Sequence, residues 1–292
     1  MTDWIELSAR ASLASHRLIG WIYWDPVAIE QYAALVGDGG LGYYIASRGA
    51  PLAPAGHQAV AAAFYSIHPG FIELCIDTAA AATTFGAIID ARNDAVGQGL
   101  RRFVPEICDA LSELGDSMWL AADALASSGR VLFAAHRQAP RPADPLVAAW
   151  LAVNCIREFR GDTHFMVLGA ENLSGVQAGL LHDAFLNYPG EWIPRSRGAD
   201  DATIAVALAD LAARGLVTDG RINDEGRALR ERIEIRTDEL TELAWRQLGA
   251  ASTRRFIELV EPVGQRLLDR IDVTAGPDWM PAARTRRADE VT

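Results

Sequence analysis

The sequence contains no lysine, so all 27 of its basic residues are arginines. Schiff-base catalysis and a Walker-type phosphate loop both need a lysine amine, and both are therefore excluded. Cysteine is also scarce, and Cys75, Cys108 and Cys155 lie far apart among apolar neighbours. We expect reduced core thiols rather than a disulfide framework or a zinc knuckle.

Long apolar runs are missing as well, and none is long enough to cross a bilayer. The first residues, MTDWIELSARASLASHR, lack both a basic leader and a small-residue cleavage site, so we expect no secretory signal. These two absences predict a cytoplasmic protein without a membrane partner.

Positive charge is in deficit, because 38 acidic residues oppose the 27 arginines and give a net charge of −11. The molecule as a whole should repel polyanions, so nucleic acid binding would need a local basic patch. Half of the residues are hydrophobic, which is enough to bury a core and excludes a disordered chain.

Alanine and leucine recur at helical spacing along nearly every long segment, which predicts a mainly α fold. We expect a helical, pocket-bearing domain over 1–190, a winged-helix-like module with C-terminal helices over 191–276, and a flexible tail over 277–292. The predicted helix 223–248 is amphipathic, with Leu229, Ile233, Leu240 and Leu243 near one side, and a helix over 252–271 could pair with it. A homodimer is therefore expected.

The most informative stretch is DPLVAAWLAVNCIREFRGDTHFMVLGAENL, residues 144–173. Asp144-Pro145 is a typical helix start, and the helix after it is apolar enough to be central and buried. Within it, helical spacing places Arg157, Arg160 and His164 along one face. Two arginines beside a histidine can hold a carboxylate or phosphate and move a proton next to it.

Glu158 and Asp162 share the adjacent face of the same helix, at i and i+4. They could orient the histidine and the substrate, or they could pair with the two arginines as an internal salt-bridge network around a core histidine. Gly161 inside the cluster favours a functional role, because it lets a ligand or another backbone approach.

A second candidate lies in AAAFYSIHPGF, residues 61–71. Tyr65 and His68 are i,i+3 neighbours before Pro69, where a helix break can point polar groups into a cavity. Either could act as acid, base or ligand, or be an aromatic core residue and a histidine at a helix end. Trp24, near the N-terminus, could shape the pocket.

Metal and cofactor motifs are absent: there is no HExxH, CxxC or HxH, and GDGGLG follows no predicted strand. No cofactor and no metal site are predicted. A metal held by His68, Asp162 and His164, or a haem held by one histidine, remains an open alternative. His16 and His182 lie in surface-like contexts.

The segment RGADDATIAVALADLAARGLVTDGRINDEGRALRERIE, from Arg197, resembles the winged helix of MarR-type regulators. The resemblance implies a recognition helix, a short wing and a following helix. Exposed positions of the recognition helix read Asp200, Asp201 and Asp210, where a DNA reader would use arginine, asparagine or glutamine. DNA is therefore not expected as a partner.

Over most of its length the chain also resembles actinobacterial helical proteins of unassigned function. The resemblance rests on Arg48-Gly49-Ala50-Pro51-Leu52, on Phe64-Tyr65 with His68-Pro69, on residues 157–164 and on Arg236-Thr237-Asp238. It implies a helical body with an RGD-x-H helix and a C-terminal winged helix, and it names no reaction.

The favoured function is a small-molecule enzyme that acts on an anionic, possibly aromatic metabolite by acid–base chemistry. The residues expected to bind the substrate are Arg157, Arg160, Glu158 and Trp24, and those expected to be catalytic are His164, Asp162, Tyr65 and His68. One alternative is a ligand-responsive MarR-like winged-helix transcriptional regulator that uses the same pocket as a sensor. A scaffold without a ligand is the third.

Overall fold

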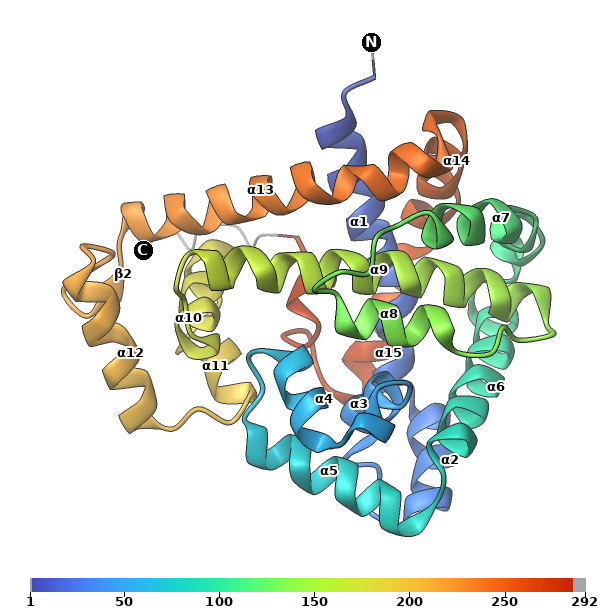
Figure 1. Ribbon diagram of the computed structural model, residues 1–292, viewed down its shortest axis with the longest axis horizontal. Coiled ribbons are helices and arrows are strands. Elements are labelled where there is room, and N and C mark those ends of the chain that lie inside the picture. Colours follow the sequence, from blue (N-terminus) through green and yellow to red (C-terminus); the bar gives the residue numbers. More distant parts are fainter. Residues whose placement is uncertain (1, 286–292) are drawn as a thin grey trace.

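The computed structural model describes residues 2–285, and it confirms the mainly α fold (Figure 1). The elements before the central helix are α1 (Trp4–Gly20), the 3₁₀ helix η1 (Trp21–Trp24), α2 (Pro26–Val36), α3 (Tyr43–Gly49), η2 (Ala53–Ala55), α4 (His57–Phe64), α5 (Pro69–Ala82), α6 (Phe85–Phe103), α7 (Pro105–Asp123) and α8 (Val131–Gln138). The remaining elements are α9 (Pro145–Ala170), α10 (Gly175–Leu186), α11 (Trp192–Ser196), α12 (Asp201–Ala213), β1 (Val217–Thr218), β2 (Arg221–Ile222), α13 (Asp224–Leu248), α14 (Ala250–Val260), η3 (Glu261–Val263), α15 (Gly264–Thr274) and η4 (Pro281–Ala283).

The central helix α9 begins where the sequence predicts. The Asp144 carboxylate accepts a hydrogen bond from Leu146 N, and Pro145 occupies the first helical position, where its missing N–H leaves no bond unmade. Helices α1, α7, α8 and α13 pack around α9, and its apolar half, which includes the fully buried Trp150, forms the middle of the main core. The polar half of α9 is thereby positioned deep inside the molecule.

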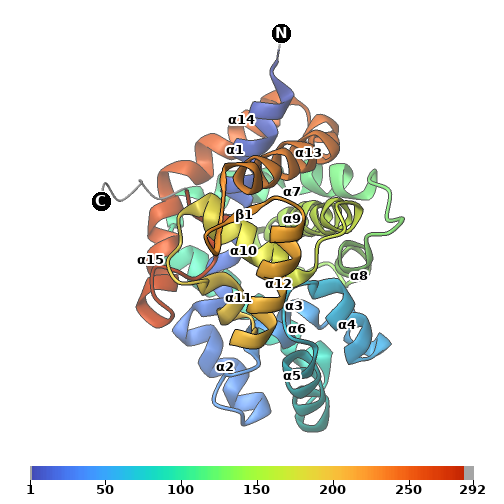
Figure 2. The same ribbon diagram turned by 90° about the vertical axis from the view of Figure 1, so that its left-hand side faces the viewer.

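The winged helix lies at one end of the molecule, where α12 and the wing project beyond the body (Figures 1 and 2). The two strands pair antiparallel through Val217–Ile222 and Thr218–Arg221, and the turn between them uses Asp219 and Gly220, both with positive φ. Asn223 then caps α13 through Gly226 N. The short wing and the following helix that the resemblance implies are present.

Two buried clusters organise the chain, and neither ends at residue 190. The winged-helix cluster runs from Val167 at the end of α9 to Ile233 in α13. The main cluster takes in Trp245 on α13, most of α14 and α15, and Met280. The division at residue 190 stays a prediction, because the long helices α9 and α13 contribute to both clusters.

The C-terminal helices pack on their own chain. Leu229 and Ile233 are buried in the winged-helix cluster, α13 packs against α9 and α1, and α14 packs against α1 and α7. Of the four apolar residues from which a homodimer was expected, Leu229 and Ile233 are thus used within the molecule, while Leu240 and Leu243 are exposed, and the homodimer stays a prediction. Pro262 also interrupts the single helix expected over 252–271, because it has no N–H to donate.

The flexible tail expected over 277–292 stays a prediction: residues 277–285 pack on the body, and 286–292 lie outside the described residues. Met280 and Ala283 are buried against the body, and Arg17 Nε donates to the Ala283 carbonyl at 3.1 Å. Arg284 Nε folds back onto the Trp279 carbonyl at 2.8 Å. Apolar burial and these two bonds to main-chain carbonyls hold the segment in place.

Across the described residues, no single helix is long and apolar enough to cross a membrane. Helices α5 and α6 pass that test of length and composition only as a pair, bent by 97° at the break between them.

Candidate functional site

A cavity of about 580 Å³, partly open to solvent, lies between the helical body and the winged helix. This volume falls in the range of small-molecule sites, which are typically about 300–1,000 Å³. Its wall is formed by residues of α1, α3, α9, α10, α11 and α13 and by the segments 64–67 and 279–284. The body and the winged helix therefore share one ligand-sized space.

Arg157 and Arg48 line this cavity, and both pair with the carboxylate of Glu158. Glu158 is fully buried, and it accepts from Arg48 Nε at 2.9 Å and Nη2 at 2.7 Å and from Arg157 Nη2 at 2.9 Å. Burial by itself would raise the pKa of Glu158, but the two guanidinium groups hold it well below its usual range. Glu158 is thus ionised and does not line the cavity itself.

Arg160 faces the cavity and pairs with helix α13. Its Nη2 donates to Asp238 at 2.9 Å and also contacts Glu234, whose other oxygen accepts from Arg230 Nη1 at 2.6 Å. Glu234 has its pKa well below the ordinary value because Arg160 and Arg230 outweigh the effect of burial. This network joins α9 to α13 at the cavity wall.

His164 lines the cavity beside this network, and its Nδ1 lies 2.9 Å from Thr237 Oγ1. Burial and, to a smaller extent, the nearby Arg230 lower its pKa to about 3. The ring is therefore neutral at pH 7. Arg157, Arg160 and His164 share one face of α9, as the helical spacing predicts.

Asp162 does not orient His164. Two positions apart on α9, the two side chains point to different neighbours, and the Asp162 carboxylate accepts from Phe133 N of α8 at 2.9 Å. Burial raises the pKa of Asp162 to about 7. The structure therefore does not bring together Asp162 and His164, which the sequence predicts as an acid–base pair.

His68 lies outside the cavity and caps α5, accepting from Gly70 N at 3.2 Å. It is exposed, Asp162 faces α8, and His164 faces α13. The open alternative of a metal held by His68, Asp162 and His164 is therefore not supported by the geometry, because their ligand atoms do not converge.

Tyr65 lines the cavity where the body contacts the winged helix. Its φ of 57° is rare for a bulky residue, its hydroxyl donates to the Leu173 carbonyl at 2.5 Å, and its ring stacks on Phe165 at 5.1 Å. The strained backbone directs this side chain to the start of α10.

Aromatic side chains cover much of the cavity wall. Trp24 packs on Tyr44 at 5.2 Å and on Trp279 at 5.8 Å between ring centres, and Trp279 meets Trp192 edge-on at 5.3 Å. Trp24 was predicted to shape the pocket, and it lines this wall together with rings from distant parts of the chain. Such walls accept flat apolar groups.

Several cavity residues were missed in the sequence. His16 is 8% exposed and His182 is half-buried, so neither lies at the surface, and burial lowers the pKa of both well below the ordinary value. Ser12 and His16, at i and i+4 on the buried face of α1, were the available signal. Arg197 and Arg230 carried no local signal, because their inward direction depends on long-range packing.

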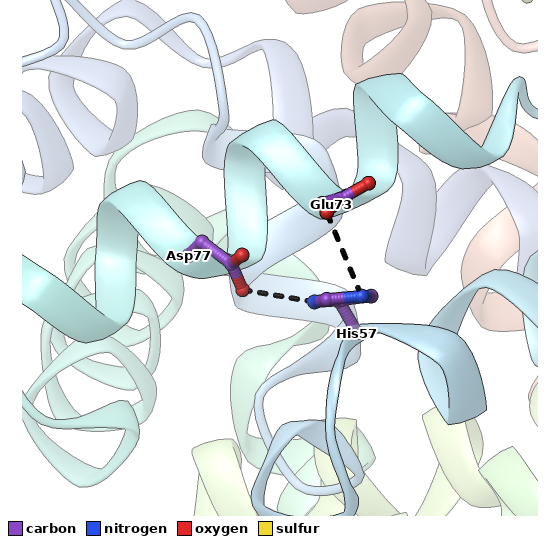
Figure 3. A group of neighbouring side chains, drawn as sticks. All are labelled: His57, Glu73 and Asp77. Carbon is purple, nitrogen blue, oxygen red and sulfur yellow. Dashed lines mark hydrogen bonds and ion pairs between the residues drawn. The ribbon is translucent and has the colours of Figure 1, made fainter.

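A separate cluster joins α4 to α5 near the surface (Figure 3). His57 Nδ1 lies 3.0 Å from Asp77, and its Nε2 lies 3.9 Å from Glu73, so the ring sits between two carboxylates. Each ring nitrogen therefore faces a different carboxylate of α5. This cluster connects two helices.

The recognition helix α12 presents an exposed face of small residues that includes Ala202, Ala205, Val206 and Ala209. Small apolar side chains let a helix approach base edges closely and contact thymine methyl groups. Figure 2 shows α12 facing outward, with its long side free of other elements.

The acidic residues of α12 are engaged within the chain. Asp200 caps the helix by accepting from Thr203 N at 2.8 Å, Asp201 pairs with Arg195 Nη1 at 2.6 Å, and Asp210 accepts from Gln177 Nε2 at 3.4 Å. Arg214, at the end of α12, and Arg221, on the wing, are exposed and form no ion pair within the described part of the chain. Two cations are thus free for phosphate contacts.

Comparison with known proteins yields one family. Residues 8–274 match a family model described as a helix-turn-helix family, whereas the chain matches no curated protein and no solved structure. The match contradicts the expectation that DNA is not a partner. That expectation treated the carboxylates of α12 as unpaired charges that would repel DNA. Since the match covers nearly the whole chain, the protein belongs to this helix-turn-helix family.

Proposed function

We propose that the protein is a ligand-responsive, MarR-like winged-helix regulator that binds DNA through α12 and the wing and binds a small molecule in the cavity. The observation that supports this most directly is the position of the cavity. Its wall includes residues of α10, which packs against α12, together with residues of α11 and α13, so a ligand there would contact both the body and the helix that supports α12.

DNA binding is proposed from the family and from the outer surface of the winged helix. Helix α12 would enter the major groove with its small residues against the bases, while Arg214 and Arg221 contact phosphates on either side. The net charge of −11 repels DNA overall, so these local cations carry much of the affinity, and binding should be strongest at low salt.

The cavity is proposed as a sensor site rather than a catalytic one. The enzyme expectation depended on His164 as an acid–base group oriented by Asp162, and these two residues face different helices. A histidine whose pKa is lowered to about 3 is also a weak base at neutral pH. Binding a ligand needs neither group to transfer a proton.

The test selects DNA sites from a random library at low salt and then measures affinity against salt concentration by fluorescence anisotropy. We expect Arg214→Ala and Arg221→Ala each to weaken binding and to reduce the slope of log K against log salt by about 1. Arg102→Ala is the matched control, because Arg102 is also exposed but lies on α6, far from the winged helix (Figure 1).

Failure to enrich any site, with no DNA binding at 50 mM salt, would rule out the regulator. Equal effects of Arg102→Ala and Arg214→Ala would show that α12 and the wing are not the contact surface.

A further inference from the structure

Positive charge is in excess around the cavity. Six arginines but only two acidic residues, Glu234 and Asp238, belong to its wall in the described part of the chain. Arg160 and Arg230 pair with those two acids, and Arg284 pairs with Asp272 outside the cavity. The arginines still to be balanced are Arg48, Arg157 and Arg197.

Glu158 is the single carboxylate that Arg48 and Arg157 share. Arg197 forms no ion pair with any described residue, and its Nη1 donates only to Ser66 Oγ at 2.8 Å. By ion pairs among the described residues, about two arginine charges of the cavity wall have no carboxylate partner, and only Asp183 acts on Arg197 from outside the wall. A bound anion would balance them.

Unpaired polar atoms belong to residues of the same cavity wall, close to Arg157. Ser12 Oγ, His16 Nδ1 and Nε2, Tyr23 Oη and Arg157 Nε have no hydrogen-bond partner among the described residues, and all four residues are more than nine-tenths buried. Buried donors and acceptors without partners are costly, so a set of four along one cavity wall indicates groups placed for a ligand.

Arg197 also joins the cavity to the recognition helix. It ends α11, four residues before α12 begins, and its carbonyl accepts from His68 N of the body at 2.9 Å. Ser66 accepts from Nη1 alone, so the other N–H groups of the Arg197 guanidinium are available to a ligand group. Occupancy of the cavity would then act on the turn that positions α12.

We infer that the cavity binds an organic anion with a flat aromatic body, and that Arg197 binds its acidic group. The inference rests on the proposed function in taking the cavity as a ligand site, and it adds the class of ligand and the residue that recognises it. The aromatic walls of Trp24, Tyr44 and Trp279 accept the flat body. A carboxylate matches the planar fork of a guanidinium.

The experiment is a calorimetric titration of the full chain with three probes that share one ring system: 2-naphthoate, 2-naphthamide and 2-naphthylmethylammonium. We expect 2-naphthoate to bind at least about tenfold more tightly than the neutral amide, and the cation to bind most weakly. Equal affinity for the amide and the carboxylate, or no binding of any probe, would overturn the inference.

The role of Arg197 is tested with Arg197→Met, which keeps an unbranched apolar stem and removes the guanidinium and its charge. The variant should lose the preference for 2-naphthoate over 2-naphthamide, while Arg195→Met should keep it, because Arg195 is exposed and pairs with Glu191 and Asp201. Circular dichroism checks folding, and Arg197→Gln, which retains a donor for Ser66, replaces a variant that does not fold. A preserved preference contradicts the assignment of Arg197.

These titrations contain no DNA, so their outcome is separate from that of the proposed function. A chain that binds 2-naphthoate but no DNA would contradict the regulator and leave the ligand class standing. A chain that binds DNA but has equal affinity for the three probes would contradict the ligand class and leave the regulator standing.

Discussion

Glu158 balances two arginines from different helices, so its charge matters more than its size. Replacing it by glutamine leaves Arg48 and Arg157 buried without a counter-ion, and removing one partner of a buried ion pair typically costs about 3–5 kcal/mol. We expect Glu158→Gln to lower the free energy of unfolding by about that amount in urea denaturation at pH 7. Glu239→Gln, in an exposed pair with Arg236, is the control and should lose less than about 0.5 kcal/mol.

Asp162 predicts a specific dependence on pH. Burial raises its pKa to about 7, above the ordinary value of 3.8, so the folded chain binds the proton more tightly than the unfolded chain does. Its contribution to stability is therefore greatest below pH 3.8 and is lost as the pH rises through 7. Asp162→Asn should gain about 2 kcal/mol relative to the wild type between pH 5 and pH 8.

The measurement compares unfolding free energies of the two proteins at both pH values, with the exposed Asp116→Asn as control. A constant difference between wild type and Asp162→Asn across this range would show that the carboxyl is ionised throughout.

The recognition helix depends on its cap. Asp200 accepts from Thr203 N, so the carboxylate stabilises the first turn of α12 while it places negative charge near the DNA. Asp200→Asn keeps a capping oxygen without the charge, and Asp200→Ala removes both. We expect DNA affinity to be equal or higher for Asp200→Asn and roughly threefold lower for Asp200→Ala, measured by fluorescence anisotropy. If both variants bind DNA more tightly, the carboxylate acts through repulsion alone.

Elements with local signals were predictable from the sequence. Asp144-Pro145 marks the start of α9, and Thr218-Asp219-Gly220 marks the wing turn, because caps and turns are determined by neighbouring residues. The segment 277–285 was not predictable, since its order comes from the burial of Met280 and Ala283 against a distant helix. Pro262 is a local signal for a helix break, and the prediction of a single helix over 252–271 did not take it into account.

The candidate site divides in the same way. Periodicity along α9 places Arg157, Arg160 and His164 on one face, and the structure brings these three to the cavity. Periodicity could not show that Asp162 faces α8, that Arg160 pairs with α13, or that Arg197 lines the cavity. Each of these contacts joins residues far apart in the sequence.

At the scale of the whole molecule, the arginines are concentrated in two regions of a protein that is acidic overall. The protein is strongly acidic, yet arginines gather around the cavity and stay unpaired at the tip of the winged helix. A regulator needs both features, one to hold an anionic ligand and one to contact phosphate. The helices α9 and α13 run between the two regions and are joined by the Arg160, Arg230 and Glu234 network.

The most direct test of this account measures the affinity of the full chain for its selected DNA site, with and without saturating 2-naphthoate, at one fixed salt concentration. Arg197 and the α9–α13 network connect the cavity to α12, so binding of the ligand and binding of DNA should be coupled. Coupling free energies of this kind change affinity by about fivefold or more. We predict a change in DNA affinity of at least that size in the wild type and none in Arg197→Met. DNA affinity that stays the same when the cavity is occupied would contradict the account.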